Sequence, residues 1–127
     1  MKRIKDPRFI GVPNINFSLT DPDDDREKIY KKQRKERGFD DSELWSLDCT
    51  IANFIIPRLE KFYEISDEVS IKCYPPQKRF LKQIDCILVA MKLITRDNGA
   101  RNFTDDEQER VQKGLKTLSK IFLGLWW

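Results

Sequence analysis

Residues 38–65 read GFDDSELWSLDCTIANFIIPRLEKFYEI, and this stretch decides the fold. Asp40 can cap the first free amides of a helix, and Glu43 can reach back to the Asp40 amide, which makes an acidic variant of the capping box. Apolar residues then recur at steps of three and four, the period of an amphipathic helix. They are Leu44, Leu47, Ile51, Ile55, Leu59 and Phe62, widened by Trp45, Ala52, Phe54, Ile56 and Tyr63. The stretch predicts a helix over about 41–65 that is buried on more than one side.

Pro57 lies inside this predicted helix. Proline has no amide hydrogen, and its ring crowds the carbonyl oxygen of Asn53, so the helix must end there or lose a hydrogen bond. We expect a helix that kinks at Pro57 and continues beyond it.

A second long helix is predicted over about 76–96, after a loop over 66–74, because prolines stand at its start and an apolar period follows. Its stripe contains Phe80, Leu81, Ile84, Ile87, Leu88, Met91 and Ile94. A third is predicted over about 105–126, where Thr104 and Glu107 satisfy the capping box. Its seam contains Val111, Leu115, Leu118, Phe122 and Leu125, with Trp126 assigned to the core.

Gly114 lies next to that seam, where the missing side chain should let another helix approach closely. Together with the terminal tryptophans, Gly114 makes a homodimer a reasonable further expectation.

The N-terminal third carries most of the charge imbalance. Residues 1–38 hold 11 Lys and Arg against 7 Asp and Glu. A charged helix over about 22–37 is expected, with acids in its first turn, bases in its last turns and a stop at Gly38. Residues 1–19 are compatible with an extended arm that lies across the body.

These elements predict an all-α single domain, in which a basic arm and charged helix over 1–38 precede a helical bundle core over 39–127. No apolar run approaches the roughly 18 residues of a membrane span, and the basic N-terminal residues lack the continuous apolar core and cleavage site of a secretory signal, so a cytoplasmic location is expected. The three cysteines, Cys49, Cys73 and Cys86, read as reduced packing residues because they are odd in number and widely spaced.

Catalytic and cofactor motifs are missing from the sequence. It contains no histidine to activate a serine or cysteine nucleophile, and its five glycines are isolated, so no phosphate loop exists. We expect no enzyme activity, no cofactor and no metal site.

Asp48 and Asp85 fall on apolar stripes, where a carboxylate is costly unless it is paired. They could form an acid/base or metal-binding pair, but ion pairs with Arg58, Lys82 or Arg79 that fix the helix register are favoured, since no third ligand is spaced to help. Asp48 and Arg58 would lie about 15 Å apart on one straight helix. Each therefore pairs elsewhere, or both face a shared cavity.

The remaining candidates are surfaces. Lys28, Lys31, Lys32 and Lys35 recur at helical spacing, with Tyr30 available for stacking, so this face could grip the phosphates of nucleic acid or of an anionic nucleotide. A solvated helix face is the alternative. Trp127 either closes the core or exposes an aromatic patch for a partner.

Several segments occur together in a distinctive order. They are Leu44-Trp45-Ser46-Leu47-Asp48, Ile51 to Leu59, Tyr74-Pro75, the helix from Phe80 to Ile94, Val111 to Leu115 and Leu125-Trp126. Over about residues 38–127 the chain resembles a family of small helical proteins encoded by bacteriophages and prophages, through the pattern Trp-x-x-Asp, Ala-x-x-Ile-x-Pro-Arg-Leu and Gly-Leu…Leu-Trp. The resemblance implies a phage protein, and it picks out Trp45, Asp48, Pro57, Arg58 and Gly114.

The lack of catalytic motifs and this resemblance lead to one functional hypothesis. The chain is expected to be a phage accessory binding protein that engages a host component, either a host protein or an anionic nucleotide signal of the kind that counter-defence proteins intercept. The alternative is a nucleic-acid-binding protein that uses the basic helix over 26–37. The candidate binding residues are Lys28, Tyr30, Lys31, Lys32, Lys35, Trp45, Asp48, Arg58, Asp85 and Trp127.

Overall fold

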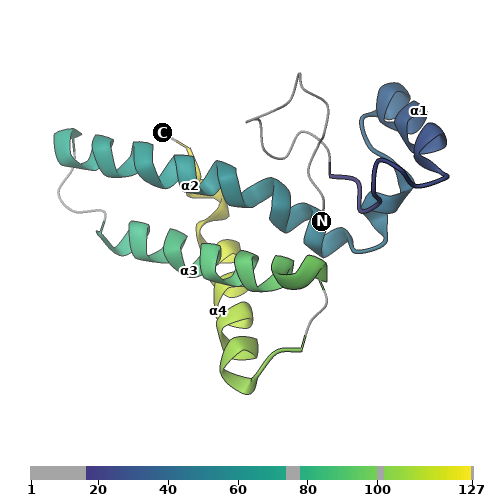
Figure 1. Cartoon of the computed structure of the whole chain (residues 1–127). Coiled ribbons are helices and arrows are strands. Elements are labelled where there is room, and N and C mark those ends of the chain that lie inside the picture. The colour runs from purple at the N-terminus through teal and green to yellow at the C-terminus, as the bar shows by residue number, and fades with distance from the viewer. Residues whose placement is uncertain (1–16, 74–77, 100–101, 127) are drawn as a thin grey trace.

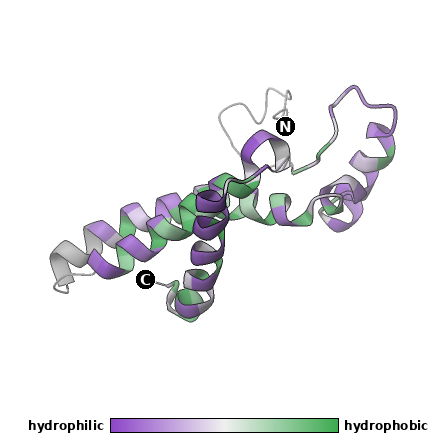
Figure 2. Ribbon diagram, turned by 90° about the horizontal axis from the view of Figure 1, so that it is seen from below, coloured by the Kyte–Doolittle hydropathy of each residue, from purple (hydrophilic) through white to green (hydrophobic). Residues whose placement is uncertain are grey.

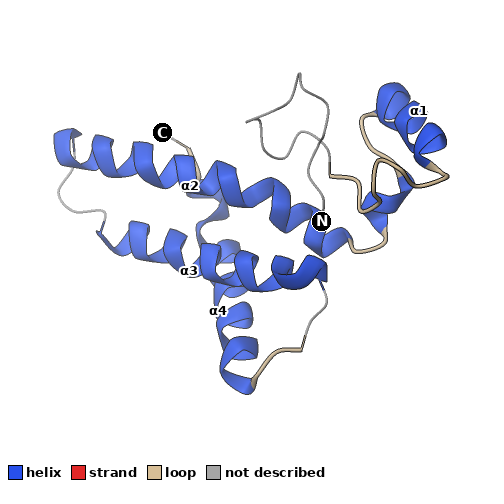
Figure 3. Cartoon of the chain, in the orientation of Figure 1, coloured by secondary structure: helices blue, strands red, loops and turns tan. Residues whose placement is uncertain are grey.

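The computed structural model describes residues 17–73, 78–99 and 102–126, with the side chains of 68–73 and 98 excepted. Several predictions lie outside these residues: those for residues 1–16 of the predicted arm over 1–19, for the start of the second long helix at Pro75 or Pro76, for the side chain of Cys73 and for Trp127. The described part contains four α-helices and no strand (Figure 3). They are α1 (Glu27–Arg37), α2 (Leu47–Cys73), α3 (Lys78–Thr95) and α4 (Asp105–Ile121). The all-α prediction is confirmed.

α3 is the central helix of the fold. It lies alongside α2, and α4 crosses it (Figure 1). α3 packs against both α2 and α4, whereas α2 and α4 approach each other at few residues. The predicted stripe of α3 is buried along its length, with Ile84 and Ile87 fully inaccessible to solvent and only Phe80 partly exposed. Apolar residues accordingly gather where the three long helices meet, while α1 is largely hydrophilic (Figure 2).

Gly114 makes the crossing of α4 over α3 possible. A Cβ atom placed on Gly114 would lie 2.2 Å from the Cβ of Ala90 and 2.8 Å from the carbonyl oxygen of Cys86. The predicted close approach of another helix is confirmed, and that helix is α3 of the same chain. Gly114 therefore lends no support to a homodimer.

α2 differs from its predicted bounds at both ends. Asp40 caps a short 3-10 turn, η2 (Asp41–Leu44), and α2 begins only at Leu47. The expected capping box is present in η2, because the Asp40 carboxylate accepts from the Ser42 amide and the Glu43 carboxylate accepts from the Asp40 amide. At the other end α2 passes through Pro57 and continues to Cys73, so the loop expected over 66–74 is helical as far as 73. No glycine or proline interrupts residues 58–73, which explains the longer helix.

α1 is shorter than predicted at its start and ends where predicted. Residues 21–26 form turns, because the Asp24 carboxylate binds both the backbone amide and the guanidinium of Arg26. The helix begins at Glu27 and ends at Gly38, which has the left-handed conformation (φ 87°) that favours glycine. α4 carries the capping box expected at Thr104. It ends at Ile121, followed by a 3-10 turn over Phe122–Gly124.

Candidate functional site

The apolar stripes of α2 and α4 face each other across a groove instead of closing together. The stripe of α2 was predicted to be buried, but Leu44, Trp45, Leu47, Ile51 and Phe54 are each about half exposed. The buried side of α2 is turned toward α3 and carries Cys49, Ala52 and Leu59. The prediction is wrong for these five residues. α3 covers only one side of α2, and Leu44 and Trp45 precede the helix. Trp45 packs against Tyr30 of α1, and the Phe54 ring lies 6.0 Å from the Phe17 ring.

Two adjoining pockets form the α2–α4 groove, and both are lined by Ile55 and Leu118. The larger pocket has a volume of about 350 Å³ and the smaller about 200 Å³. The larger is also lined by Asp48, Ile51, Met91, Ile94, Phe103, Gln108, Val111, Gln112 and Leu115. The smaller is also lined by Phe54, Arg58, Leu59, Phe62, Phe122 and Leu125. We use the name α2–α4 groove for these residues.

Among the residues that the structure describes, Arg58 is the one polar side chain that lines the smaller pocket. Its guanidinium lies 3.7 Å from the centroid of the Phe54 ring and donates a hydrogen bond of 2.9 Å to the Phe54 carbonyl oxygen. These two contacts fix the side chain at the mouth of the pocket. No carboxylate in the described part of the chain forms an ion pair with Arg58, so its charge is available to a ligand.

Asp48 lines the larger pocket and is exposed. Its carboxylate accepts hydrogen bonds from the Ser46 hydroxyl (3.0 Å) and the Cys49 amide (2.9 Å). The expected burial of Asp48 is wrong, because the buried side of α2 carries Cys49, Ala52 and Leu59 instead. Asp48 and Arg58 do not share one cavity, but they line two adjoining pockets of the groove.

Asp85 lies elsewhere. Asp85 is exposed on α3 and lines neither pocket of the groove. The prediction that it is buried in an ion pair is therefore wrong. The structure therefore does not bring Asp48 and Asp85 together in one pocket. In the residues that the structure describes, no group of three or more His, Cys, Asp or Glu side chains is arranged to hold a metal ion.

The lysines of α1 are separated from its aromatic residue. Lys28, Lys31, Lys32 and Lys35 are exposed, and we call them the α1 lysine face. Tyr30, which was expected to be available for stacking, is buried and packs edge-on against Trp45 at a centroid distance of 6.1 Å. Tyr30 is the only aromatic residue of α1. Because its ring packs against Trp45, α1 itself has no exposed ring on which a base could stack.

Trp45 keeps about half of its surface exposed, and the guanidinium of Arg26 lies 4.9 Å from its ring centroid. The partially exposed ring thus sits between α1 and the start of α2. Trp126, which was assigned to the core, is three-quarters exposed, so that assignment is wrong. α4 has already ended at Ile121, and the following turn carries Trp126 away from the seam.

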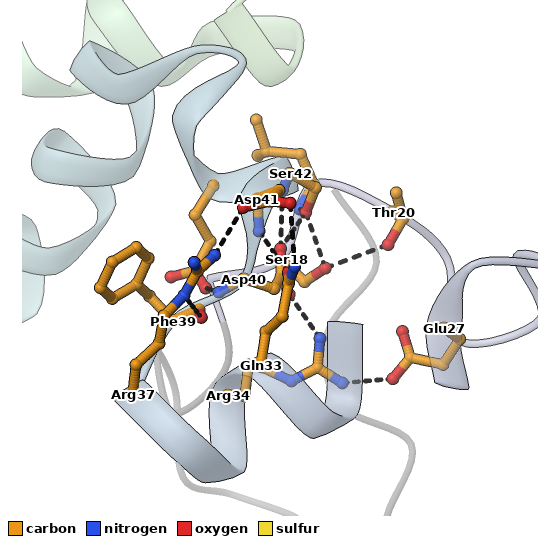
Figure 4. A network of polar contacts seen from close by, with 12 residues as sticks. Ser18, Thr20, Glu27, Gln33, Arg34, Arg37, Phe39, Asp40, Asp41 and Ser42 are labelled. Carbon is orange, nitrogen blue, oxygen red and sulfur yellow. Dashed lines mark hydrogen bonds and ion pairs between the residues drawn. The ribbon is translucent and has the colours of Figure 1, made fainter. Parts of the chain in front are cut away.

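A buried polar network attaches α1 to η2 (Figure 4). Arg34 of α1 forms ion pairs with Glu27 and with the fully buried Asp40. Asp40 also accepts a hydrogen bond from the Ser42 hydroxyl, and Ser42 is hydrogen-bonded to Ser18 at 2.9 Å. The network therefore joins three separate segments of the chain.

Neighbouring contacts support the same junction. Burial raises the pKa of the Glu43 carboxyl group, which also accepts the Asp40 amide hydrogen bond. Arg37 pairs with Asp41, and Gln33 both donates to and accepts from Asp41. Arg34 and Arg37 are thus engaged within the chain. The lysines of α1 point outward, and Lys32 lies 3.8 Å from the Glu36 carboxylate.

Comparison with known proteins gives no relative to guide the assignment: no family model, no curated protein and no solved structure matches the chain. Among the described residues, no helix is both long and apolar enough to cross a membrane.

Sequence reasoning identified Asp48 and Arg58 in the groove but missed most of its other residues. Gln108, Gln112 and Phe103 carried no signal as site residues. Leu115 and Phe122 were recognised only as parts of a seam. Their regular spacing showed that they share one side of α4, but not that this side lacks a neighbour.

Proposed function

We propose that this protein is a non-catalytic binding protein that receives an apolar segment of a partner protein in the α2–α4 groove. The observation that carries the proposal is the exposure of apolar side chains on both walls. Ile51 on α2 is 49% exposed and Leu115 on α4 is 39% exposed. Contiguous apolar surface that leads into pockets is typical of protein interaction sites.

The size and shape of the groove favour a protein segment over a small molecule. Pockets that enclose drug-sized ligands have volumes of about 300–1,000 Å³. The smaller pocket, at about 200 Å³, falls below that range, and the larger one, at about 350 Å³, is near its lower limit. Two modest pockets that adjoin each other suit two apolar side chains projecting from one surface.

Together with the sequence resemblance, the groove supports a phage accessory factor that acts in the host cytoplasm on a host protein, in the manner of a counter-defence protein. An anionic nucleotide signal is less well supported. Tyr30, the aromatic residue of α1, is buried and so is not available to stack on a base. Among the described residues, the smaller pocket offers one cation, Arg58, among apolar side chains. The partner is therefore proposed to be a protein.

Photo-crosslinking tests the proposal at the groove itself. The photoreactive residue p-benzoylphenylalanine is placed at Phe122, which lines the smaller pocket and is 59% exposed, and the chain is expressed in bacterial cells. The matched control carries it at Phe39, which is also exposed but lies outside the groove. We expect light-dependent adducts with one host protein from position 122 only. Equal adducts from both positions, or none from position 122, would count against the groove.

The α1 lysine face supports a second candidate function, nucleic-acid binding. Four exposed lysines on one helix can contact at most about four phosphates, so log Kd should rise with log salt with a slope of roughly 3 to 4. A gel-shift series on duplex DNA or RNA, run at salt concentrations from about 50 to about 300 mM, measures this slope. Lys31→Glu together with Lys35→Glu should abolish binding. A dissociation constant that does not change with salt would remove this candidate. Binding of an apolar segment in the groove, by contrast, should depend little on salt.

A further inference from the structure

We propose that the segment received by the α2–α4 groove is an amphipathic α-helix of about three turns that carries an acidic residue where it meets Arg58. This inference rests on the proposed function and specifies the chemistry of the partner.

The length of the groove sets the length of the helix. Asp48 lines one pocket and Arg58 the other, with Ile55 and Leu118 shared between them. Ten residues of α2 separate Asp48 from Arg58, which corresponds to about 15 Å at 1.5 Å per residue. A ligand helix of about ten residues has the same length, and two of its apolar side chains, three to seven residues apart, can enter the two pockets.

The lining of the groove argues for a helix over an extended segment. Its walls are mainly helices, whose backbone groups are hydrogen-bonded within each helix except opposite Pro57. Among the described residues, Arg58 is the only polar side chain in the smaller pocket. An extended ligand would bury amide and carbonyl groups there without partners, at a cost of roughly 1–3 kcal/mol for each group. The described part also offers no strand edge to pair with. A helix satisfies its own backbone and presents only side chains.

Arg58 supplies the charge complementarity. Its contacts with the Phe54 ring and carbonyl oxygen hold the guanidinium at the mouth of the smaller pocket. A guanidinium has five N–H donors, so donors remain after the bond to Phe54, and their planar arrangement matches a carboxylate. Since no carboxylate of the described chain pairs with Arg58, an Asp or Glu of the ligand fits this position.

Selection from a randomised peptide library tests the inference. Sixteen-residue peptides, a length of about four and a half helical turns, are displayed and selected on the immobilised full chain. Peptides that also bind Ile51→Ser are discarded, because that variant makes one wall of the groove polar. A parallel selection uses the variant Arg58→Glu. Because position 58 is exposed, this variant is expected to fold. Thermal melting of each variant verifies folding.

We expect the enriched peptides to share apolar residues at spacings of three or four with an acidic residue beside them, and to become helical on binding by circular dichroism. The Arg58→Glu selection should enrich a basic residue at the same place. For one selected peptide, Arg58→Glu should weaken binding roughly two- to fivefold or more, the range of an exposed ion pair.

Three outcomes would overturn the inference. Enriched sequences with strictly alternating apolar residues or internal prolines would show an extended ligand. The absence of any sequence specific to the unaltered groove would show that no peptide helix fits it. Sedimentation of the chain as a dimer that Ile51→Ser converts to a monomer would show that a second copy occupies the groove. If the adduct between position 122 and a host protein persists in any of these cases, the proposed function stands while the helix inference fails.

Discussion

The backbone of Gly114 in α4 packs against the side chain of Ala90 in α3. A Cβ atom on Gly114 would lie 2.2 Å from the Cβ of Ala90. The contact fixes where α4 crosses α3, and therefore how far the other side of α4 stands from α2. Val111 and Leu118 line the groove and flank Gly114 on α4, so this packing contact helps to set the width of the groove.

Replacing Gly114 by alanine should destabilise the protein. The new methyl group must displace α4, at a cost of about 1–3 kcal/mol for overpacking, while the gain in helix propensity is at most about 1 kcal/mol. A net loss of about 1–2 kcal/mol in the free energy of unfolding should follow in a urea titration. Gly124→Ala is the control, because a Cβ there meets nothing within 4 Å. A more stable Gly114→Ala variant would show that the helices are not in close contact.

Asp40→Ala should release α1 from the rest of the protein. The substitution removes the buried partner of Arg34 and the cap of η2, and breaking a buried ion pair costs on the order of 3 kcal/mol. The loss should be local, since η2 is the helical element of the described part that α1 contacts most. Hydrogen exchange should therefore accelerate in α1 and stay slow in α3. Asp41→Ala, at an exposed neighbouring position, should change much less.

The start of α4 should lose stability in acid. A hydrogen bond from Arg96, followed by one from the Thr104 amide, lowers the pKa of Glu107 from its usual 4.5 to about 2. Because the folded-state pKa is depressed, this carboxylate stabilises the protein above about pH 4.5, and the stabilisation is lost as the pH falls toward about 2. Wild type should melt above Glu107→Gln at pH 7, and the difference should shrink between these two pH values. A difference that does not vary with pH would contradict the contact with Arg96.

Local signals in the sequence predicted local structure well. The capping residues Asp40 and Thr104, the helix stop at Gly38 and the close approach at Gly114 each depend on a few neighbouring residues and on backbone geometry. The buried stripe of α3 was also predicted, because a central helix is covered on most sides whatever the arrangement of its neighbours. Ile84 is an example.

The candidate site could be predicted only in part. The apolar period of α2 identified Ile51, and that of α4 identified Leu115, as members of stripes. Periodicity shows which residues share one side of a helix, but the crossing of α4 over α3 decides whether that side is covered. The same limit explains why Asp48 was expected to be buried and Trp126 to be part of the core.

Capture of a partner by full-length wild-type and variant chains tests the central claim most directly. Ile51→Ser alters the groove, and Ile29→Ser makes the same exchange at another half-exposed isoleucine, on α1. Mass spectrometry of proteins retained from bacterial lysate should show one protein bound by wild type and by Ile29→Ser at equal yield, and reduced at least about tenfold by Ile51→Ser, the size expected from losing a buried apolar contact. Equal retention by all three chains would contradict the account, because binding would then not use the α2–α4 groove.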